Sequence, residues 1–444
     1  MMKRQSITLA AMMALSVCSA IAQSRQWDLK QCIDYAIEHN LSIKQQEANK
    51  EGSEVDVSTA KWSRLPDLNG SASHSFSFGR SLQMDNTYQQ LNTQNTGLNL
   101  NTNIPLFTGM QITHNIALSK LNLKAAVEDL NKAKEDISIQ VTSAYLQVLF
   151  NEELAKVAHE QVALSEEMLT QKAAYFKVGK ASEADFYEAK ARVAQDRLSA
   201  VQADNEYRLA LLDLSQLLEL PSPEDFGIVS PDIDETKDFG MLTAPADIYS
   251  EALLIKPSIK AAQYRLEGAQ RSIRIAQSAY YPQLSLGAGI STSYYNVSGK
   301  ENGNFGAQLR DNFSQYIGLS LSIPIFNRFA TRNQVRKARI QQTTLHWQLE
   351  DAKKALYKEI QQAYYSAVNA ESKFESSRAA DEAAEASFKL MKEKYANGKA
   401  TSTEFNEART NWLKAVSDRI QAKYDYLFRY KILDFYKGVP LTLE

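Results

Sequence analysis

The chain has 444 residues and a formal net charge of −2, from 50 Lys and Arg against 52 Asp and Glu. This balance lacks the basic excess typical of nucleic-acid-binding proteins, so the sequence predicts no nucleic-acid partner. Glycine (17) and proline (10) are scarce for this length, which argues against a loop-rich fold and favours long, uninterrupted secondary structure.

The N-terminus has the pattern of a secretory signal peptide. Lys3 and Arg4 form a charged start, and residues 7–17 are mostly apolar but too short to span a bilayer. Residues 20–22 (Ala-Ile-Ala) then supply a cleavage pattern of small residues. We therefore expect residues 1–22 to be removed and the mature chain to be exported. The alternative is a cytoplasmic protein with an apolar start.

The two cysteines of the chain bear on this prediction. Cys18 lies inside the predicted signal, where the run Leu-Ser-Val-Cys resembles a lipoprotein signal only weakly, because Val is a poor residue before a lipidated Cys. Cys32 is then left alone, so the mature chain has no internal disulfide bond. No later stretch approaches the ~20 consecutive apolar residues of a transmembrane helix, which leaves a secreted soluble protein or a β-barrel.

The chain contains an internal duplication. The motif Ile-Pro-Leu-Phe at 104–107 returns as Ile-Pro-Ile-Phe at 323–326, an offset of 219 residues (324 − 105). Gly-Lys-Ala at 179–181 returns at 398–400 with the same offset, and prolines and acids from 221 to 245 interrupt the helical periodicity between the copies. Each copy reads helix, strand, loop, strand, long helix, turn, helix. The predicted boundaries are 1–22 for the signal peptide, 23–230 for the first structural repeat and 231–444 for the second.

Four segments alternate apolar and polar residues with a period of two, which predicts β-strands of ~8–11 residues. Their apolar faces carry no charged residue, and the opposite faces carry mainly Ser, Asn and Gly. An apolar face towards lipid and an uncharged polar face towards water fit a transmembrane barrel, whereas the alternative is a soluble sheet packed on a core. The segments run from 68 to 78, from 98 to 104, from 284 to 293 and from 316 to 323.

Four strands cannot close a barrel, because about eight is the practical minimum. Open edges in lipid would leave backbone groups unpaired at several kcal/mol each, so we expect the strands to pair with other copies of the chain. Two, three or four copies satisfy this requirement. Polar loops at 79–96 and 295–312 are expected to join the strand pairs on the extracellular side.

A long helix is predicted after each strand pair. Residues 110–176 and 330–396 lack glycine and proline, and apolar residues recur at spacings of three and four. At 1.5 Å per residue, each helix would be roughly 100 Å long, which indicates a helical array rather than a globule. Shorter partner helices are predicted at 182–220 and 401–436, and upstream helices at 29–64 and 246–280.

The turns between these helices have explicit signals. Gly179 and Gly398 suit the position after a helix C-terminus that needs a positive φ. Each glycine is followed by a Ser or Thr with an acidic residue three positions later, the pattern of a capping box at the start of the next helix. These boxes pair Ser182 with Asp185 and Thr401 with Glu404. The local sequence thus predicts two helical hairpins.

On the duplication, the two Ile-Pro-x-Phe motifs and the two glycine turns, the chain resembles the TolC-like outer-membrane efflux family across essentially its whole mature length. The resemblance implies an α+β membrane protein in which a homotrimer forms a 12-stranded β-barrel, four strands per chain, continued by a long α-helical barrel. It also implies a periplasmic adaptor protein at the helix tips and an inner-membrane pump beyond it. The implied adaptor-contacting residues are Gly179, Lys180, Ala181, Gly398, Lys399 and Ala400.

The resemblance also implies a channel gate at the helix tips. In the family, the acidic residue of the first tip motif acts with a Tyr three positions before the second glycine, and here these residues are Asp185 and Tyr395. A well-known member has an Arg two positions after that glycine. This chain has Ala400 there, next to Lys399, so any charged contact at that point must differ from the one in that member. Asp185 has a second interpretation, because it also fits a helix cap.

The same well-known member lines its channel entrance with acidic residues, and the corresponding positions here are Glu404 and Glu407, which fall on one helical face. In a trimer they would gather up to six carboxylates (three copies of two) around a constriction, an arrangement that favours cations. The alternative is a solvated acidic tip with no role in selectivity.

The sequence shows no nucleophile–base set, phosphate-binding glycine loop or metal-ligand spacing, so we predict neither an enzyme nor a cofactor. We expect the exit duct of a tripartite efflux or type I secretion system, located in the outer membrane and extending into the periplasm. Its predicted role is passive export of small molecules or ions. The alternative is a non-conducting structural envelope protein of coiled helices, which would not need polar, uncharged strand faces.

Overall fold

The computed structural model describes residues 25–82, 86–222, 226–231 and 242–443. The predicted signal peptide, with its Cys18, lies outside the described residues. The chain divides into two compact units. Among the described residues, those within 25–47, 129–257 and 353–443 form the first unit, and those within 48–128 and 258–352 form the second.

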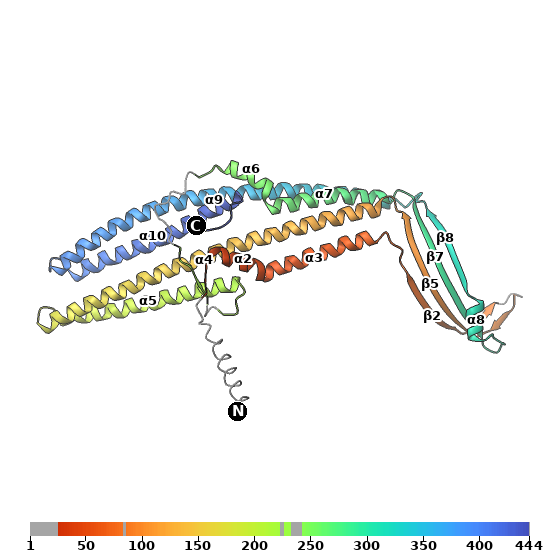
Figure 1. The fold of residues 1–444 in the computed structure, drawn as a ribbon, viewed down its shortest axis with the longest axis horizontal. Coiled ribbons are helices and arrows are strands. Elements are labelled where there is room, and N and C mark those ends of the chain that lie inside the picture. The colour runs from red at the N-terminus through yellow and green to blue at the C-terminus, as the bar shows by residue number, and fades with distance from the viewer. Residues whose placement is uncertain (1–24, 83–85, 223–225, 232–241, 444) are drawn as a thin grey trace, which may run out of the picture. The chain divides into compact units, whose positions relative to one another are not determined.

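The second unit contains a four-stranded antiparallel sheet in the order β2-β5-β7-β8, in which the strands lie side by side (Figure 1). The strands are β2 (Asn69–Ser77), β5 (Thr93–Phe107), β7 (Gln283–Val297) and β8 (Ser314–Ser322). All four predicted strands are confirmed, but β5 and β7 have 15 residues each and are longer than predicted. Their extra residues pair with each other, as Thr93 does with Val297. This pairing satisfies the backbone N–H and C=O groups of these extra residues, whose polar composition had suggested loops.

Both of the predicted polar loops contain secondary structure, which corrects the prediction for 79–96 and 295–312. In the first, β3 (Arg80–Leu82) pairs with β4 (Tyr88–Gln90). In the second, α8 (Phe305–Asp311) lies against β7. The amide of Gln308 donates to the carbonyl of Tyr295 and accepts from its N–H, each at 3.0 Å. These contacts with a strand, which no local pattern reveals, hold the short helix in place.

The register of the sheet brings the predicted faces together. Leu98 of β5 lies opposite Ala72 of β2 and Thr292 of β7. Other pairs on this face are Leu100–Ile290, Leu286–Leu319 and Leu284–Leu321. On the other face, one row consists of Ser71, Asn99, Ser291 and Ser314. The sheet therefore has one apolar face and one polar face, and none of its four strands contains a charged residue.

The helices of the two halves of the chain have equal lengths. In the first half they are α2 (Leu29–His39), α3 (Leu41–Trp62), α4 (Gln111–Lys177) and α5 (Glu183–Leu217), with 11, 22, 67 and 35 residues. In the second half they are α6 (Pro245–Ile255), α7 (Pro257–Ser278), α9 (Ala330–Ala396) and α10 (Ser402–Tyr436), again with 11, 22, 67 and 35 residues. The repeat boundary near residue 230 stays a prediction.

Each upstream helix is broken in two, so the predictions of single helices at 29–64 and 246–280 were wrong. Lys256 is extended (φ −66°, ψ 125°) because the ring of Pro257 disfavours helical geometry in the residue before it. Asn40 is extended in the same way (φ −62°, ψ 130°). Its side chain accepts from the N–H of Ser42 at 2.9 Å and donates to the carbonyl of Leu217 at 3.2 Å, which replaces helical hydrogen bonds.

The core of the first unit lies where α4, α5 and α10 meet α2, beside a parallel pair of short strands. These strands are β1 (Arg25–Trp27) and β6 (Phe226–Ile228). Tyr145 is almost fully buried there and donates to the carbonyl of Val229. Cys32 is fully buried, and burial raises the pKa of its thiol to about 12. The thiol is therefore protonated and packs as a small apolar group.

No helix among the described residues is both long enough and apolar enough to cross a membrane.

Candidate functional site at the helix tips

The two hairpin turns at the tips of the long helices have the same backbone. Gly179 has φ +70° and Gly398 has φ +69°, as the sequence predicted. The N–H of each glycine donates to the carbonyl three residues earlier, and the N–H of the next residue donates to the carbonyl five residues earlier. A Cβ atom would meet nothing within 4 Å at either glycine. The left-handed conformation, rather than lack of space, therefore requires glycine at both turns.

Both predicted capping boxes are confirmed. The N–H of Asp185 donates to the hydroxyl of Ser182 at 3.1 Å, and the carboxylate of Asp185 accepts from the N–H and hydroxyl of Ser182. Thr401 and Glu404 repeat these contacts at the start of α10. The hydrogen bonds from Ser182 hold the pKa of Asp185 below its ordinary value, and those from Thr401 do the same for Glu404. Both carboxylates are therefore charged at neutral pH.

An aromatic pair closes each tip. Phe176 stacks on Phe186 in the first hairpin, with ring centroids 5.6 Å apart, and Tyr395 stacks on Phe405 in the second at 4.8 Å. The hydroxyl of Tyr395 lies 3.1 Å from the hydroxyl of Ser402. The second tip thus carries a hydrogen-bonding group at a position where the first tip has only a phenyl ring.

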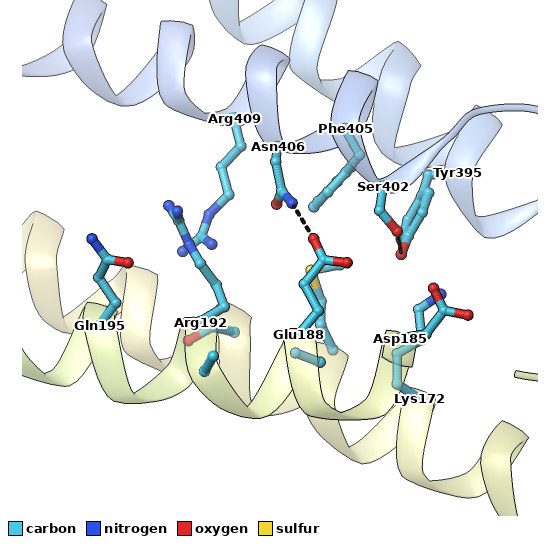
Figure 2. Close-up of a pocket in the computed structure, with 14 residues that line it drawn as sticks. Lys172, Asp185, Glu188, Arg192, Gln195, Tyr395, Ser402, Phe405, Asn406 and Arg409 are labelled. Atoms are coloured by element: carbon cyan, nitrogen blue, oxygen red, sulfur yellow. Dashed lines mark hydrogen bonds between the residues drawn. The ribbon is translucent and has the colours of Figure 1, made fainter. Parts of the chain in front are cut away.

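A cavity of about 230 Å³ lies just behind the tips, lined by residues of α4, α5, α9 and α10 (Figure 2). Both predicted gate residues, Asp185 and Tyr395, line this cavity. Within the chain, however, their hydrogen bonds go to Ser182 and Ser402 rather than to each other. The assignment of these two residues as a gate stays a prediction.

Lys172 connects these two residues electrostatically, although sequence reasoning passed it over. Its ammonium group lies 4.7 Å from the ring centroid of Tyr395, a cation–π contact between α4 and α9. Its charge also helps to lower the pKa of Asp185, after the hydrogen bonds from Ser182. A cation therefore lies beside both predicted gate residues.

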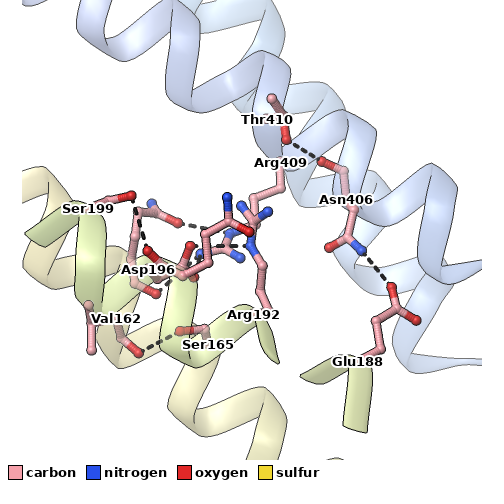
Figure 3. A network of polar contacts seen from close by, with 11 residues as sticks. Val162, Ser165, Glu188, Arg192, Asp196, Ser199, Asn406, Arg409 and Thr410 are labelled. Atoms are coloured by element: carbon pink, nitrogen blue, oxygen red, sulfur yellow. Dashed lines mark hydrogen bonds and ion pairs between the residues drawn. The ribbon is translucent and has the colours of Figure 1, made fainter. Parts of the chain in front are cut away.

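A buried ion pair joins the two hairpins through Arg409, which also lines the cavity (Figure 3). Arg409 of α10 is only 1 % exposed, and its guanidinium donates to the carboxylate of Asp196 of α5 at 2.6 Å. It also donates to the side chain and carbonyl of Gln161 of α4, at 3.0 and 3.3 Å. Burial lowers the pKa of Arg409 and the charge of Asp196 opposes this effect, and the guanidinium stays protonated because its ordinary pKa is very high.

Two further contacts extend this network. The Nε atom of Arg192 lies 3.2 Å from the Asp196 carboxylate, as an ion pair without hydrogen-bond geometry. Closer to the tip, the amide of Asn406 donates to Glu188 at 3.3 Å, from α10 to α5. Removing one partner of the buried ion pair would leave the other charge uncompensated in the interior, which is strongly unfavourable.

The duplication gave no signal for this network. At the offset of 219 residues, Arg409 corresponds to Lys190 and Asp196 to Ala415, so neither partner recurs in the other repeat. An Arg on a helix is more often a solvated residue than a buried one. Only the packing of α10 against α5 shows that Arg409 is buried.

The remaining predicted site residues lie at the outer surface of the tips. Glu404 and Glu407 are exposed, and neither lines the cavity. Lys180 and Lys399 are exposed as well, next to the turn glycines. Among the described residues, no group of three His, Cys, Asp or Glu side chains is arranged to hold a metal ion. The roles of these residues as an acidic entrance and as adaptor contacts stay predictions.

Comparisons with known proteins agree on one family. The family model described as "Outer membrane efflux protein" matches residues 32–219 and 248–438. Outer membrane protein TolC of Escherichia coli K12 is 24 % identical over 430 residues, which cover 94 % of this chain and 82 % of TolC. Outer membrane efflux protein BepC of Brucella suis biovar 1 is 24 % identical over 307 residues, 69 % of this chain and 62 % of BepC, so that alignment spans less than two thirds of BepC.

The fold agrees with solved structures as well. The outer membrane protein VceC of Vibrio cholerae superimposes with a TM-score of 0.73 at 19 % sequence identity, and the match covers 94 % of this chain and 98 % of VceC. At this identity the likeness concerns the fold alone. It shows that the element order described above is that of a known outer-membrane architecture.

Proposed function

Because the chain belongs to the outer membrane efflux protein family, whose members are channels of the outer membrane rather than enzymes, we propose that three copies form an exit duct. In this proposal the sheets close into a 12-stranded barrel in the outer membrane, and the long helices continue it as a tunnel through the periplasm. Small molecules or ions then leave passively, delivered by an inner-membrane pump through a periplasmic adaptor.

The observation that carries this proposal is the sheet. Its two outer strands, β2 and β8, each have one neighbour among the described residues, and one face of the sheet is apolar and exposed. In lipid, an unpaired backbone edge would cost several kcal/mol per group, so the edges of different copies must pair. Three copies give twelve strands, and the uncharged polar face then lines a watery interior.

The helix tips support a controlled entrance to this duct. The turns, caps and cavity concentrate charged and aromatic side chains where two hairpins meet. In the proposal, Asp185 and Tyr395 form the gate, and Glu404 and Glu407 contribute an acidic ring that favours cations. The turn residues 179–181 and 398–400 contact the adaptor, which suits the exposure of the glycines and lysines among them.

A planar-bilayer recording of the purified full-length protein tests the proposal. We expect discrete single-channel openings that select cations over anions. Glu407→Gln should reduce this selectivity, and it leaves the cap at Glu404 untouched. A persistently silent bilayer, with trimers shown to be inserted, would favour the alternative of a non-conducting structural envelope protein.

A further inference from the structure

The first turns of α9 carry a concentration of cations without acids. Arg328 precedes the helix, and Arg332, Arg336, Lys337 and Arg339 follow within its first ten residues; these five form the junction cluster. All five are exposed. No Asp or Glu occurs anywhere from 312 to 349. Across the described part of the chain, no ion pair joins any of the five to another residue.

Two other helices that adjoin the sheet, α4 and α7, share this charge pattern, whereas α3 carries acids, the last of them Asp56. In α4, residues 111–127 include Lys120 and Lys124 but no acid. In α7, Arg271 and Arg274 follow the last acid of that helix. Burial lowers the pKa of His114, and the charges of Arg271 and Arg274 lower it further. The excess of cations thus extends over several helix ends of the second unit.

Exposed apolar side chains lie directly before the junction cluster. After β8 ends at Ser322, Ile325 is 94 % exposed and Phe326 is 71 % exposed. Phe329 packs edge-on against Phe326, and the guanidinium of Arg332 lies 4.3 Å from the Phe329 ring centroid. Exposed aromatic residues followed by basic residues are typical of a protein surface at the boundary between a membrane and water.

The distance of these charges from the apolar residues decides whether they can attract lipid headgroups. At 1.5 Å per residue, the ten residues from Ala330 to Arg339 span about 15 Å along the helix. Charges attract an anionic lipid surface within about a Debye length, roughly 8–10 Å at physiological salt. Most of the cluster therefore lies within reach of headgroups at the boundary marked by Ile325 and Phe326.

We propose that the junction cluster binds the headgroups of acidic phospholipids in the periplasmic leaflet of the outer membrane. The proposal rests on the proposed function only in placing the sheet in that membrane. Apolar contacts from Phe326 and Phe329 with acyl chains, next to unpaired arginines, fit a lipid better than a soluble anion. An acidic cargo inside the duct is the competing occupant.

Native mass spectrometry of the full-length protein in detergent tests this directly, with phosphatidylglycerol and phosphatidylcholine as probes. We expect phosphatidylglycerol to be retained at least about tenfold more strongly, given the number of cations. Arg332→Gln, Arg336→Gln and Arg339→Gln together should abolish this preference. The matched control replaces Lys373, Lys389 and Lys392, exposed residues of the same helix, by Gln, and it should keep the preference.

Three outcomes would overturn the proposal. The first is equal retention of the two lipids by the unmodified protein, and the second is an equal loss of preference in the control variant. The third is a triple-Arg variant that keeps its lipid preference but shows an altered anion permeability, which would place the cluster in the cargo path. Added salt should weaken phosphatidylglycerol binding to the unmodified protein, a check that needs no variant. Lipid retention is read in detergent, so a silent bilayer would refute the duct and leave this result standing.

Discussion

The two helix tips of the chain have the same backbone and different side chains. Each has a glycine with φ near +70°, a capping box and a stacked aromatic pair. At equivalent positions, however, the first tip has Phe176 and Lys190 where the second has Tyr395 and Arg409. The comparison shows which features the hairpin itself requires, because they recur. Of the features that differ, Arg409 joins the two hairpins through Asp196, whereas the hydroxyl of Tyr395 bonds to Ser402 within the second hairpin.

Removing Arg409 should have the largest effect on stability. Arg409→Met leaves the carboxylate of Asp196 buried with only Arg192 nearby, so we expect a loss of about 3–5 kcal/mol in the free energy of unfolding. Lys190→Met, the equivalent change in the first repeat, concerns an exposed residue and should change stability by less than about 0.5 kcal/mol. Denaturant unfolding followed by far-ultraviolet circular dichroism measures both.

A second variant separates charge burial from packing at this site. Adding Asp196→Leu to Arg409→Met removes the buried carboxylate that has lost Arg409 as its partner, and it should restore part of the lost stability. Equal stabilities of Arg409→Met and Lys190→Met would contradict a stabilising role of the buried ion pair at Arg409.

The turn glycines should be equally sensitive at the two tips. Gly179→Ala and Gly398→Ala each place a Cβ atom on a left-handed residue, at a cost of about 1–2 kcal/mol. Gly52→Ala is the control of opposite sign, because Gly52 lies inside α3 with free space around it and should gain about 0.5–1 kcal/mol. Thermal unfolding measures all three. A large difference between the stability losses of Gly179→Ala and Gly398→Ala would contradict the shared backbone conformation of the two turns.

Loss of a cap should have a smaller effect that depends on pH. Ser182→Ala should cost about 1 kcal/mol near neutral pH. The pKa of Asp185 is lowered in the folded chain, so its contribution is complete above the ordinary Asp pKa and is lost as the pH falls through the lowered value. The difference between Ser182→Ala and the unmodified protein should therefore shrink below about pH 4. A difference that grew on acidification would contradict the cap.

Tyr395→Phe should have a modest effect on stability and a clear effect on conductance. It makes the second tip resemble the first and removes one hydrogen bond, to Ser402, at a cost of about 0.5–1.5 kcal/mol. If Tyr395 belongs to a gate, the variant should open more often in a planar bilayer. Phe176→Tyr, the reverse change at the first tip, should leave conductance as it was. Unchanged conductance in Tyr395→Phe would contradict the predicted Asp185–Tyr395 gate.

Local signals in the sequence predicted most of the fold. The bounds of α9 follow from the absence of glycine and proline, and the capping boxes follow from residues three positions apart. The faces of the sheet follow from strict alternation, which the register confirms. The break at Asn40 had no such signal, because an isolated Asn occurs inside many helices and only its contact with Leu217 shows what it does here.

The site was less predictable because its contacts lie between hairpins. The pairing of Arg409 with Asp196 joins residues 213 positions apart, and neither has a counterpart in the other repeat. Lys172 gave no pattern either, since its contact with Tyr395 depends on how α4 packs against α9. Sequence periodicity shows which face of a helix is apolar, but it does not show which polar residue of another helix will face it.

Cross-linking between copies tests the central claim, that the sheets of three copies close on one another. A Cys in place of Ser73 in β2 and another in place of Ser320 in β8 lie on opposite edges of the sheet, and both belong to its polar face. Cys32 should not interfere, because it is fully buried and its thiol has a pKa of about 12. With a flexible bifunctional thiol reagent, the duct predicts covalent species up to a trimer and no larger, while each single-Cys variant stops at the monomer. A ladder that continues beyond three copies, or no cross-linking at all, would contradict the closed barrel.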